Sequence, residues 1–254
     1  MIEQVVEQQA LKMEAIRIVD RLTETALNHE RTYPSSIQAV LVFSGPGTYY
    51  DRLKQGQQER QRWMDRDRIR AGVAVVRQVA ASVKTELSGR RFRVSDIDKI
   101  DVHSFGPFLV YNGIPIENEV FLRALESPFC KMPPEKVVVI NQVKEENGST
   151  HSIRHSGDQV KSLFQEVADP KSILYGAKNI AFVAHIPDFI RIPFYIQKYS
   201  SEYVDVSGQE LHFWFYALKS RSNTMEEHMN AELTRLVEYA KLGQLDTTPC
   251  AFAV

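Results

Sequence analysis

Residues 37–47 read IQAVLVFSGPG, a nearly continuous apolar run that stops at a turn of small residues. Residues 136–140 (KVVVI) and 179–184 (NIAFVA) have the same character. Short apolar runs bounded by turn residues are typical of strands that are buried on both faces. Segments with a helical spacing of apolar residues separate these runs. The alternation of strands and helices therefore predicts an α/β fold, with a mostly parallel sheet covered by helices on both faces.

The remaining segments extend this pattern along the whole chain. Further strands are expected at residues 99–102, 107–111 and 211–218. Helices are expected at residues 2–29, 67–88, 117–125, 155–167, 186–199 and 225–241, where apolar residues recur every three or four positions. No internal repeat or low-complexity linker divides the sequence. We therefore expect one domain over residues 1–254, with 2–29 and 225–241 as flanking helices.

Composition and charge narrow the classes of function. The chain has 254 residues, 43% of them hydrophobic, with a net charge of −1. No basic field is present to attract nucleic acid or an anionic membrane. Cys130 and Cys250 lie far apart and indicate reduced thiols, and the histidines lack the spacing of a zinc motif, so no metal is expected. Charged residues throughout the first thirty lead us to expect no signal peptide, no membrane span and a cytoplasmic location.

Small or polar residues at the first two strand exits suggest a ligand site. Ligands of parallel sheets bind beyond the carboxyl ends of the strands, where backbone N–H groups and helix dipoles favour polar groups. The candidates here are Ser44, Gly45 and Gly47 at the first exit, and Asn112, Gly113, Glu117 and Glu119 at the second. A plain tight turn explains the first exit equally well, since GxGxxG and Walker fingerprints are absent. A turn and a helix N-terminus explain the second equally well.

Two later exits add further candidates. Residues 142–158 are expected to form a long polar loop, in which Ser149, Thr150 and Asp158 exceed what a helix cap requires. His185 follows the strand at 179–184 and is a candidate proton carrier, although a lone histidine is more often structural. Arg191 in the next helix and Arg70 in the helix after the first exit are candidates for binding an anion.

Taken in order, these stretches resemble the YdcF-like family, which also includes SanA-like envelope proteins. The resemblance covers roughly residues 37–200. It is carried by residues 39–47, 67–71 (DRIRA), 112–119, 132–140 (MPPEKVVVI), 149–150, 157–159 and 180–191. Asp158 and Gln159 stand where the family has Glu-Asn, and the acidic residue expected near 140–141 is missing. The resemblance implies a Rossmann-like sheet and a pocket for a nucleotide-like or otherwise anionic small molecule, with S-adenosylmethionine among its ligands.

Three functions are open on this evidence. The first is an enzyme that acts on a small polar metabolite of specialised biosynthesis. In this reading Glu117 or Glu119, Asp158 and His185 are acid–base groups, and Arg191 holds a carboxylate or phosphate. The second is a non-catalytic sensor that binds a nucleotide or S-adenosylmethionine. The third is a scaffold that forms a homodimer through the helices at 2–29 and 225–241, whose apolar faces otherwise pack on the sheet.

Overall fold

The computed structural model describes residues 2–28, 31–44, 55–92, 94–145, 147–204, 210–219 and 225–254. Five strands form one parallel sheet in the order β3-β2-β1-β6-β7. Their bounds are β1 (Ala39–Phe43), β2 (Phe108–Asn112), β3 (Val137–Ile140), β6 (Asn179–His185) and β7 (His212–Leu218). The helices are α1 (Ile2–Asn28), α2 (Gln55–Ser88), α3 (Val102–Phe105), α4 (Pro115–Leu125), α5 (Ser156–Ala168), α6 (Ile192–Val204) and α7 (Met225–Lys241). The predicted α/β fold with a parallel sheet is therefore confirmed.

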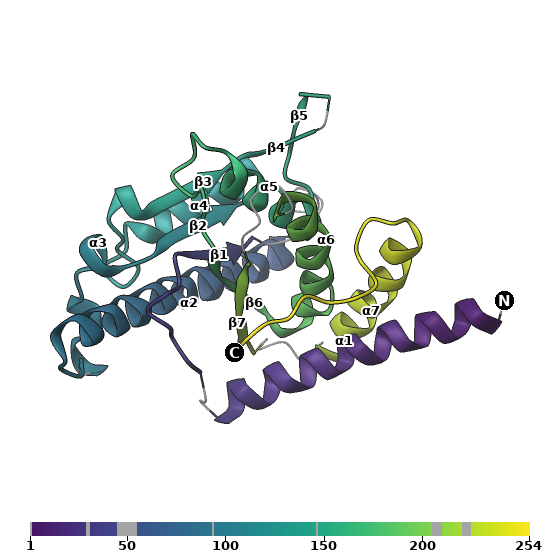
Figure 1. Cartoon of the computed structure of the whole chain (residues 1–254), viewed down its shortest axis with the longest axis horizontal. Helices are drawn as coiled ribbons and strands as arrows, with labels where there is room; N and C mark the ends of the chain where they lie inside the picture. The colour runs from purple at the N-terminus through teal and green to yellow at the C-terminus, as the bar shows by residue number, and fades with distance from the viewer. Residues whose placement is uncertain are drawn as a thin grey trace.

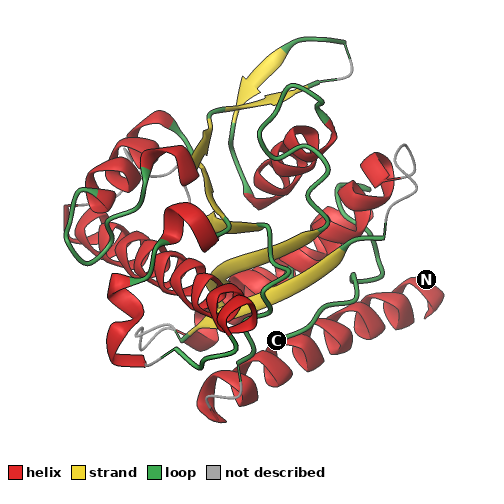
Figure 2. Cartoon of the chain, turned by 60° about the vertical axis from the view of Figure 1, so that its left-hand side comes forward, coloured by secondary structure: helices red, strands yellow, loops and turns green. Residues whose placement is uncertain are grey.

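Helices cover both faces of the sheet because successive strand residues point to opposite sides. Leu41 and Phe43 of β1 belong to a core that includes residues of α1, α5, α6 and α7. Val40 and Val42 belong to a second core, built with α2, α3 and α4. All five residues of β1 are buried, which is why its sequence has no polar alternation. Figures 1 and 2 show the strands enclosed between these two helical layers.

Gly72 lets α2 lie close against the sheet. A Cβ at this position would lie 2.2 Å from Cγ2 of Val42 and 3.3 Å from Cδ1 of Leu109. No other side chain fits the space between the helix and these two strands. The close approach fixes the amino-terminal half of α2 over the ends of β1 and β2, next to the site described below.

Three local predictions are wrong. Residues 99–102 are not a strand: a 3-10 helix (Val94–Lys99) ends there and α3 begins, with the Asp101 carboxylate accepting a hydrogen bond from the N–H of Ser104. The helix after β1 begins at Gln55 rather than Asp67. Its first turns were not predicted because they are polar and show no apolar periodicity. Residues 142–158 contain an antiparallel hairpin, β4 (Gln142–Lys144) and β5 (Thr150–Ser152), instead of a long loop.

The last residues of the chain cover the β7 edge of the sheet. The N–H of Phe215 donates to the carbonyl oxygen of Ala253 at 2.9 Å, and the N–H of Ala253 donates to that of Phe213 at 2.8 Å. These bonds satisfy backbone groups that an outer strand otherwise exposes. In the part of the chain that the structure describes, no helix combines the length and apolar character that crossing a bilayer requires.

Candidate functional site

The strand order creates a topological switch point between β1 and β6. From β1 the sheet grows through β2 and β3 on one side and through β6 and β7 on the other. Phe43 pairs with Asn112, and Asn112 with Ile140, so these strands end level with one another. Val42 pairs with Val183, which brings the end of β6 to the same edge. Because ligands of open parallel sheets bind in the crevice at such a point, the residues after β1, β2 and β6 form the candidate site.

A network of side-chain amides joins the ends of β1 and β2 to the first turns of α5. Nδ2 of the fully buried Asn112 donates to the carbonyl oxygen of Gln159 at 2.6 Å and to Oγ of Ser162 at 2.9 Å. Nε2 of Gln159 donates to Oγ of Ser44 and to the carbonyl oxygen of Asn112, both at 2.7 Å. The structure thus brings Ser44 and Asn112 together and holds both of them rigidly.

Glu117 supplies a buried carboxyl group beside this network. It lies in the first turn of α4, is 3% exposed, and accepts a hydrogen bond from the N–H of Ile114 at 3.2 Å. Burial, followed by the negative charge of Asp65, raises the pKa of Glu117 from 4.5 to about 7, although a hydrogen bond with Ser44 opposes the shift. Glu117 therefore changes between its protonated and ionised forms near neutral pH.

Gly113 provides the space that the Glu117 carboxyl group occupies. A Cβ at Gly113 would lie 2.6 Å from Oε2 of Glu117 and 3.0 Å from Oγ of Ser44. The carbonyl oxygen of Gly113 accepts a hydrogen bond from Nδ2 of Asn118 at 3.0 Å, and the same nitrogen donates to Oδ1 of Asn141 at 2.6 Å. Through Asn141, the end of β3 is also joined to the site.

Charged groups of α2 link the two sides of the switch point. Arg68 is 3% exposed, and its guanidinium binds Oδ1 of Asp65 at 3.1 Å and Oδ2 of Asp188 at 3.2 Å. Asp188 lies in the 3-10 helix η4 (Ile186–Ile190) that follows β6, and it also accepts a hydrogen bond from the N–H of His185 at 3.2 Å. Burial opposes ionisation of Asp188, but Arg68 keeps the pKa of this carboxyl group below its usual value.

Neither Asp65 nor Arg68 is among the candidate site residues that the sequence predicts. A signal was present: Asp65 lies four residues before Ile69, and Arg68 lies four residues before Gly72. Residues four apart share one face of a helix, so both charges lie on the stripe that packs against the sheet. A charged residue on a buried stripe requires a charged partner, and such a pair of positions is a candidate functional site.

Tyr111 also belongs to this site and was not predicted. Its ring is fully buried and stacks on Phe121, with the ring centroids 4.3 Å apart. Burial and then the negative charges of Asp65 and Glu117 raise the pKa of Tyr111 well above 10, so the phenol stays protonated. The hydroxyl group forms no hydrogen bond with any residue that the structure describes. Tyr111 therefore places an uncharged hydroxyl group among the charges of the site.

His185 lies where the sequence predicted it, at the carboxyl end of β6. It is 2% exposed, and the Asp188 carboxylate and the His185 ring interact electrostatically. The four residues Ser44, Asn112, Glu117 and His185 therefore share one edge of the sheet. The sequence predicted that the segments after these three strands, β1, β2 and β6, would meet at this edge.

Arg191 has a different environment from the one predicted. Its Nε donates to Oε2 of Glu232 in α7, and its Nη1 donates to the hydroxyl of Tyr195 at 3.4 Å. Glu232 is 1% exposed and also binds Arg235 at 2.6 Å. The guanidinium lies over the ring of Tyr239, 5.4 Å from its centroid. Arg191 thus attaches α7 to the end of η4, and its charge is already matched within the protein.

Asp158 lies in the first turn of α5. Its Oδ2 accepts a hydrogen bond from the N–H of Arg154 at 2.8 Å, and its own N–H donates to Nδ1 of His155 at 3.3 Å. The ring of His155 lies against the rings of Tyr195 and Tyr239, with centroids 6.3 and 6.4 Å apart. Burial lowers the pKa of His155, so its ring is mainly neutral at pH 7. These contacts give Asp158 a structural role, since its carboxylate holds the residue that precedes the His155 cap.

The other predicted residues lie away from this edge or outside the described residues. Ser149 and Thr150 are exposed on the β4–β5 hairpin, which projects beyond the sheet (Figure 1). Glu119 is exposed and forms an ion pair with Arg123 one turn along α4. Arg70 is exposed and interacts with Cys130, on the flank of α2 that faces the segment after α4. Gly45 and Gly47 lie outside the described residues.

The site offers hydroxyl, amide and carboxyl groups rather than a set of metal ligands. Within the described ranges, no group of three or more His, Cys, Asp or Glu side chains is arranged to hold a metal ion. Comparisons with family models, with curated proteins and with solved structures find no match for this chain. The chemistry of the site therefore follows from its own residues: a carboxyl group poised near neutral pH, a neighbouring serine and a buried phenol.

Proposed function

We propose that this protein is an enzyme that acts on a small polar metabolite at the switch point, with Glu117 as its general acid–base group. The observation that supports the proposal most is the burial of Glu117 among Ser44, Asp65 and Tyr111 at the carboxyl ends of the strands. A general acid–base group works best when its pKa lies near the working pH, and that of Glu117 is about 7.

The surrounding groups have distinct roles in this proposal. Burial, together with the charge of Asp65, keeps the pKa of Glu117 high, and Arg68 holds Asp65 in place. Ser44 and Tyr111 offer hydroxyl groups that can bind the substrate or pass a proton between it and Glu117. The amide network around Asn112 and Gln159 fixes Ser44 and so limits its motion relative to the carboxyl group.

The charges favour a hydroxyl- or amine-bearing metabolite over the anionic one expected from the sequence. Arg68 is bound by two carboxylates, and Arg191 is bound by Glu232. A guanidinium whose charge is already matched gains less from a phosphate or carboxylate ligand. The resemblance to the YdcF-like family supports this proposal through Ser44, Asn112 and Glu117, which meet, and less through Ser149 and Arg191, which lie elsewhere.

A second function is favoured by one observation. In dinucleotide-binding parallel sheets, a carboxylate about twenty residues after the glycine-rich turn binds a ribose hydroxyl. Glu117 lies much further along the chain from the turn after β1, but it follows β2 and lies beside Ser44 at the end of β1, which is a suitable place for a ribose. A nucleoside, or S-adenosylmethionine with its ribose and amine, also carries the hydroxyl or amine groups that the charges of the site favour. The second proposal is therefore binding of such a ligand without turnover.

One experiment separates the two functions. The wild-type protein, the Glu117→Gln variant and the Glu119→Gln variant are each incubated with a mixture of small metabolites, and the mixture is followed by mass spectrometry. Glu119 is exposed on the same helix, so its variant is a matched control. Turnover that is lost only in Glu117→Gln supports the enzyme. Calorimetric binding of adenosine or S-adenosylmethionine without turnover supports the second function, and the absence of both effects rejects the site.

A further inference from the structure

A cavity lined by Arg70 lies on the flank of α2 that is turned away from the switch point. It has a volume of about 450 Å³ and lies between α2, the 3-10 helix Val94–Lys99 and the segment that follows α4. Arg70 and Arg77 both line it and are two helical turns apart, so they share one face of α2. Arg68 binds Asp188 at the switch point instead. The cavity is therefore separate from the site described above.

No carboxylate matches the positive charge of Arg70 in the part of the chain that the structure describes. The guanidinium interacts with the thiol of Cys130. Burial raises the pKa of that thiol, so the thiol is uncharged at neutral pH. Asp98 also lines the cavity, but its Oδ1 already binds Nη1 of Arg77 at 2.7 Å. An anion that enters the cavity therefore meets an unmatched guanidinium.

Arg77 fixes the wall of the cavity that lies across from α2. It is 8% exposed, and it donates to the carbonyl oxygens of Phe129 at 3.1 Å and of Lys131 at 3.4 Å. These bonds hold residues 129–131 against α2. Cys130 is 3% exposed and packs inward, which leaves the Phe129 side chain on the outside, where it lines the cavity. The wall is thus held in place by the protein itself.

Phe129 gives the cavity an exposed aromatic surface. It is 80% exposed, although it belongs to a residue type that is usually buried. A flat ring that stacks on Phe129 removes apolar surface of both partners from water. Ile97 is partly buried and adds apolar surface to the same cavity. A cavity of this size, with apolar walls and a few polar groups, is typical of a small-molecule site.

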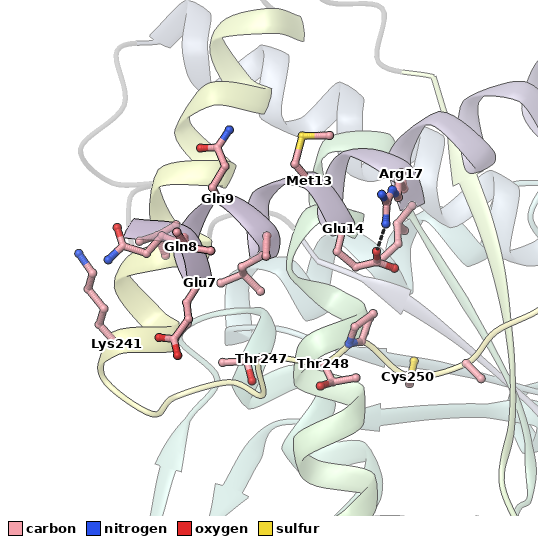
Figure 3. Close-up of a pocket in the computed structure, with 18 of the residues that line it drawn as sticks. Glu7, Gln8, Gln9, Met13, Glu14, Arg17, Lys241, Thr247, Thr248 and Cys250 are labelled. Carbon is pink, nitrogen blue, oxygen red and sulfur yellow. Dashed lines mark hydrogen bonds and ion pairs between the residues drawn. The ribbon is translucent and has the colours of Figure 1, made fainter. Parts of the chain in front are cut away.

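A larger groove elsewhere on the molecule offers less to an anion. It has a volume of about 1800 Å³ and runs between α1, α7 and residues 247–252 (Figure 3). Its Arg17 is bound by Glu14 at 3.2 Å, and its Arg21 lies over the ring of Phe252, 4.9 Å from the centroid. Both guanidinium groups of that groove are therefore already engaged.

We propose that the cavity beside Arg70 binds a small aromatic anion, whose carboxylate or phosphate group binds the guanidinium and whose ring stacks on Phe129. A guanidinium can donate two parallel hydrogen bonds to either anionic group, which fixes the orientation of the ligand. Gln78 lines the same cavity, and its amide is a further donor. The inference does not depend on Glu117 or on the function proposed for the switch point.

NMR titration with simple probes tests the ligand class. Benzoate and phenyl phosphate carry a ring and a negative charge, benzamide carries the ring without the charge, and acetate carries the charge without the ring. Benzoate or phenyl phosphate should shift the backbone amide resonances of residues 70–78 and 129, and should bind about tenfold more tightly than benzamide or acetate. The tighter of the two anions identifies the preferred group. If neither shifts these resonances at about 20 mM, or if benzamide binds as tightly, the proposal is wrong.

Two substitutions test the two contacts separately. Arg70→Gln should weaken the binding of benzoate about tenfold and leave the weaker binding of benzamide unchanged, whereas Phe129→Ala should weaken both. Arg90→Gln and Tyr175→Ala are matched controls, because both residues are exposed outside the cavity. All four variants should keep the wild-type thermal unfolding midpoint, since each changes an exposed side chain. Unchanged affinity for benzoate in Arg70→Gln rejects the site.

Discussion

Among single residues, Glu117 couples the site to pH most strongly. Its pKa is about 7 in the folded protein against 4.5 in water, because burial and Asp65 disfavour the charged form. Between these two values the folded chain keeps a proton that the unfolded chain has lost. The folded state therefore binds more protons than the unfolded state, and stability falls as the pH rises from 4.5 to 7.

The Glu117→Gln variant should lack this part of the pH dependence. From the difference between the two pKa values, Glu117 makes wild type lose about 3 kcal/mol of unfolding free energy over that range. Urea denaturation at several pH values measures the slope. The Glu119→Gln control should keep the wild-type slope, since Glu119 is exposed. Identical slopes in all three proteins would show that Glu117 ionises normally.

Gly113→Ala should disturb the same carboxyl group by steric contact. The added Cβ lies 2.6 Å from Oε2 of Glu117, so either the carboxyl group or the backbone must move, at a cost of roughly 1–3 kcal/mol. Gly72→Ala is the comparison, because its Cβ meets Val42 in the core instead. Both variants should be less stable, but only Gly113→Ala should change the pH dependence of stability. A Gly113→Ala protein with unchanged stability contradicts the packing described here.

Among elements, the ion pair of Arg191 and Glu232 attaches α7 to the rest of the fold. Breaking a buried pair leaves one charge without its partner, and Glu232→Gln should cost about 3–5 kcal/mol of unfolding free energy. The exposed pair of Arg123 and Glu119 is the control, since Glu119→Gln should change stability by less than about 1 kcal/mol. Guanidinium chloride denaturation compares the two. If Glu232→Gln and Glu119→Gln changed the unfolding free energy equally, the bond to Glu232 would not hold α7, and Arg191 would be available to another partner.

The apolar pattern predicted most elements. The strand β1 was predicted from a continuous apolar run that is buried on both faces, and the helix α7 from apolar residues that recur on one face. The four residues 99–102 are too few to separate a strand from a helical turn, and the Asp101 cap decides for the helix. The β4–β5 hairpin has only three residues in each strand, so its sequence resembles a polar loop.

At the scale of the whole molecule, α1 is part of the fold because one of its sides is buried against the sheet. Leu22 is 1% exposed in the core that α1 shares with the sheet. Leu22→Ala should cost about 2–4 kcal/mol, whereas Val6→Ala should change stability by less than about 0.5 kcal/mol. Thermal unfolding of both variants checks the difference. A negligible effect at Leu22 would mean that α1 is detachable.

The sequence could predict part of the site because parallel strands end at one edge. That rule alone places Ser44, Asn112, Glu117 and His185 together. It does not reveal contacts between distant segments, such as that of Arg68 with Asp188 or that of Arg191 with Glu232. Those pairs depend on how the helices pack, and one sequence carries no direct record of that packing. The anion-binding role predicted for Arg191 accordingly has less support than its role in holding α7.

Direct titration of Glu117 tests the central claim, that the strand ends enclose a carboxyl group poised for proton transfer. Carbon-13 NMR of labelled glutamate side chains, compared between wild type and Glu117→Gln, identifies its carboxyl resonance. We predict a midpoint near pH 7, which falls in Asp65→Asn because a neighbouring negative charge is removed. A Glu117 resonance that titrates near pH 4.5 in the wild type would contradict the claim.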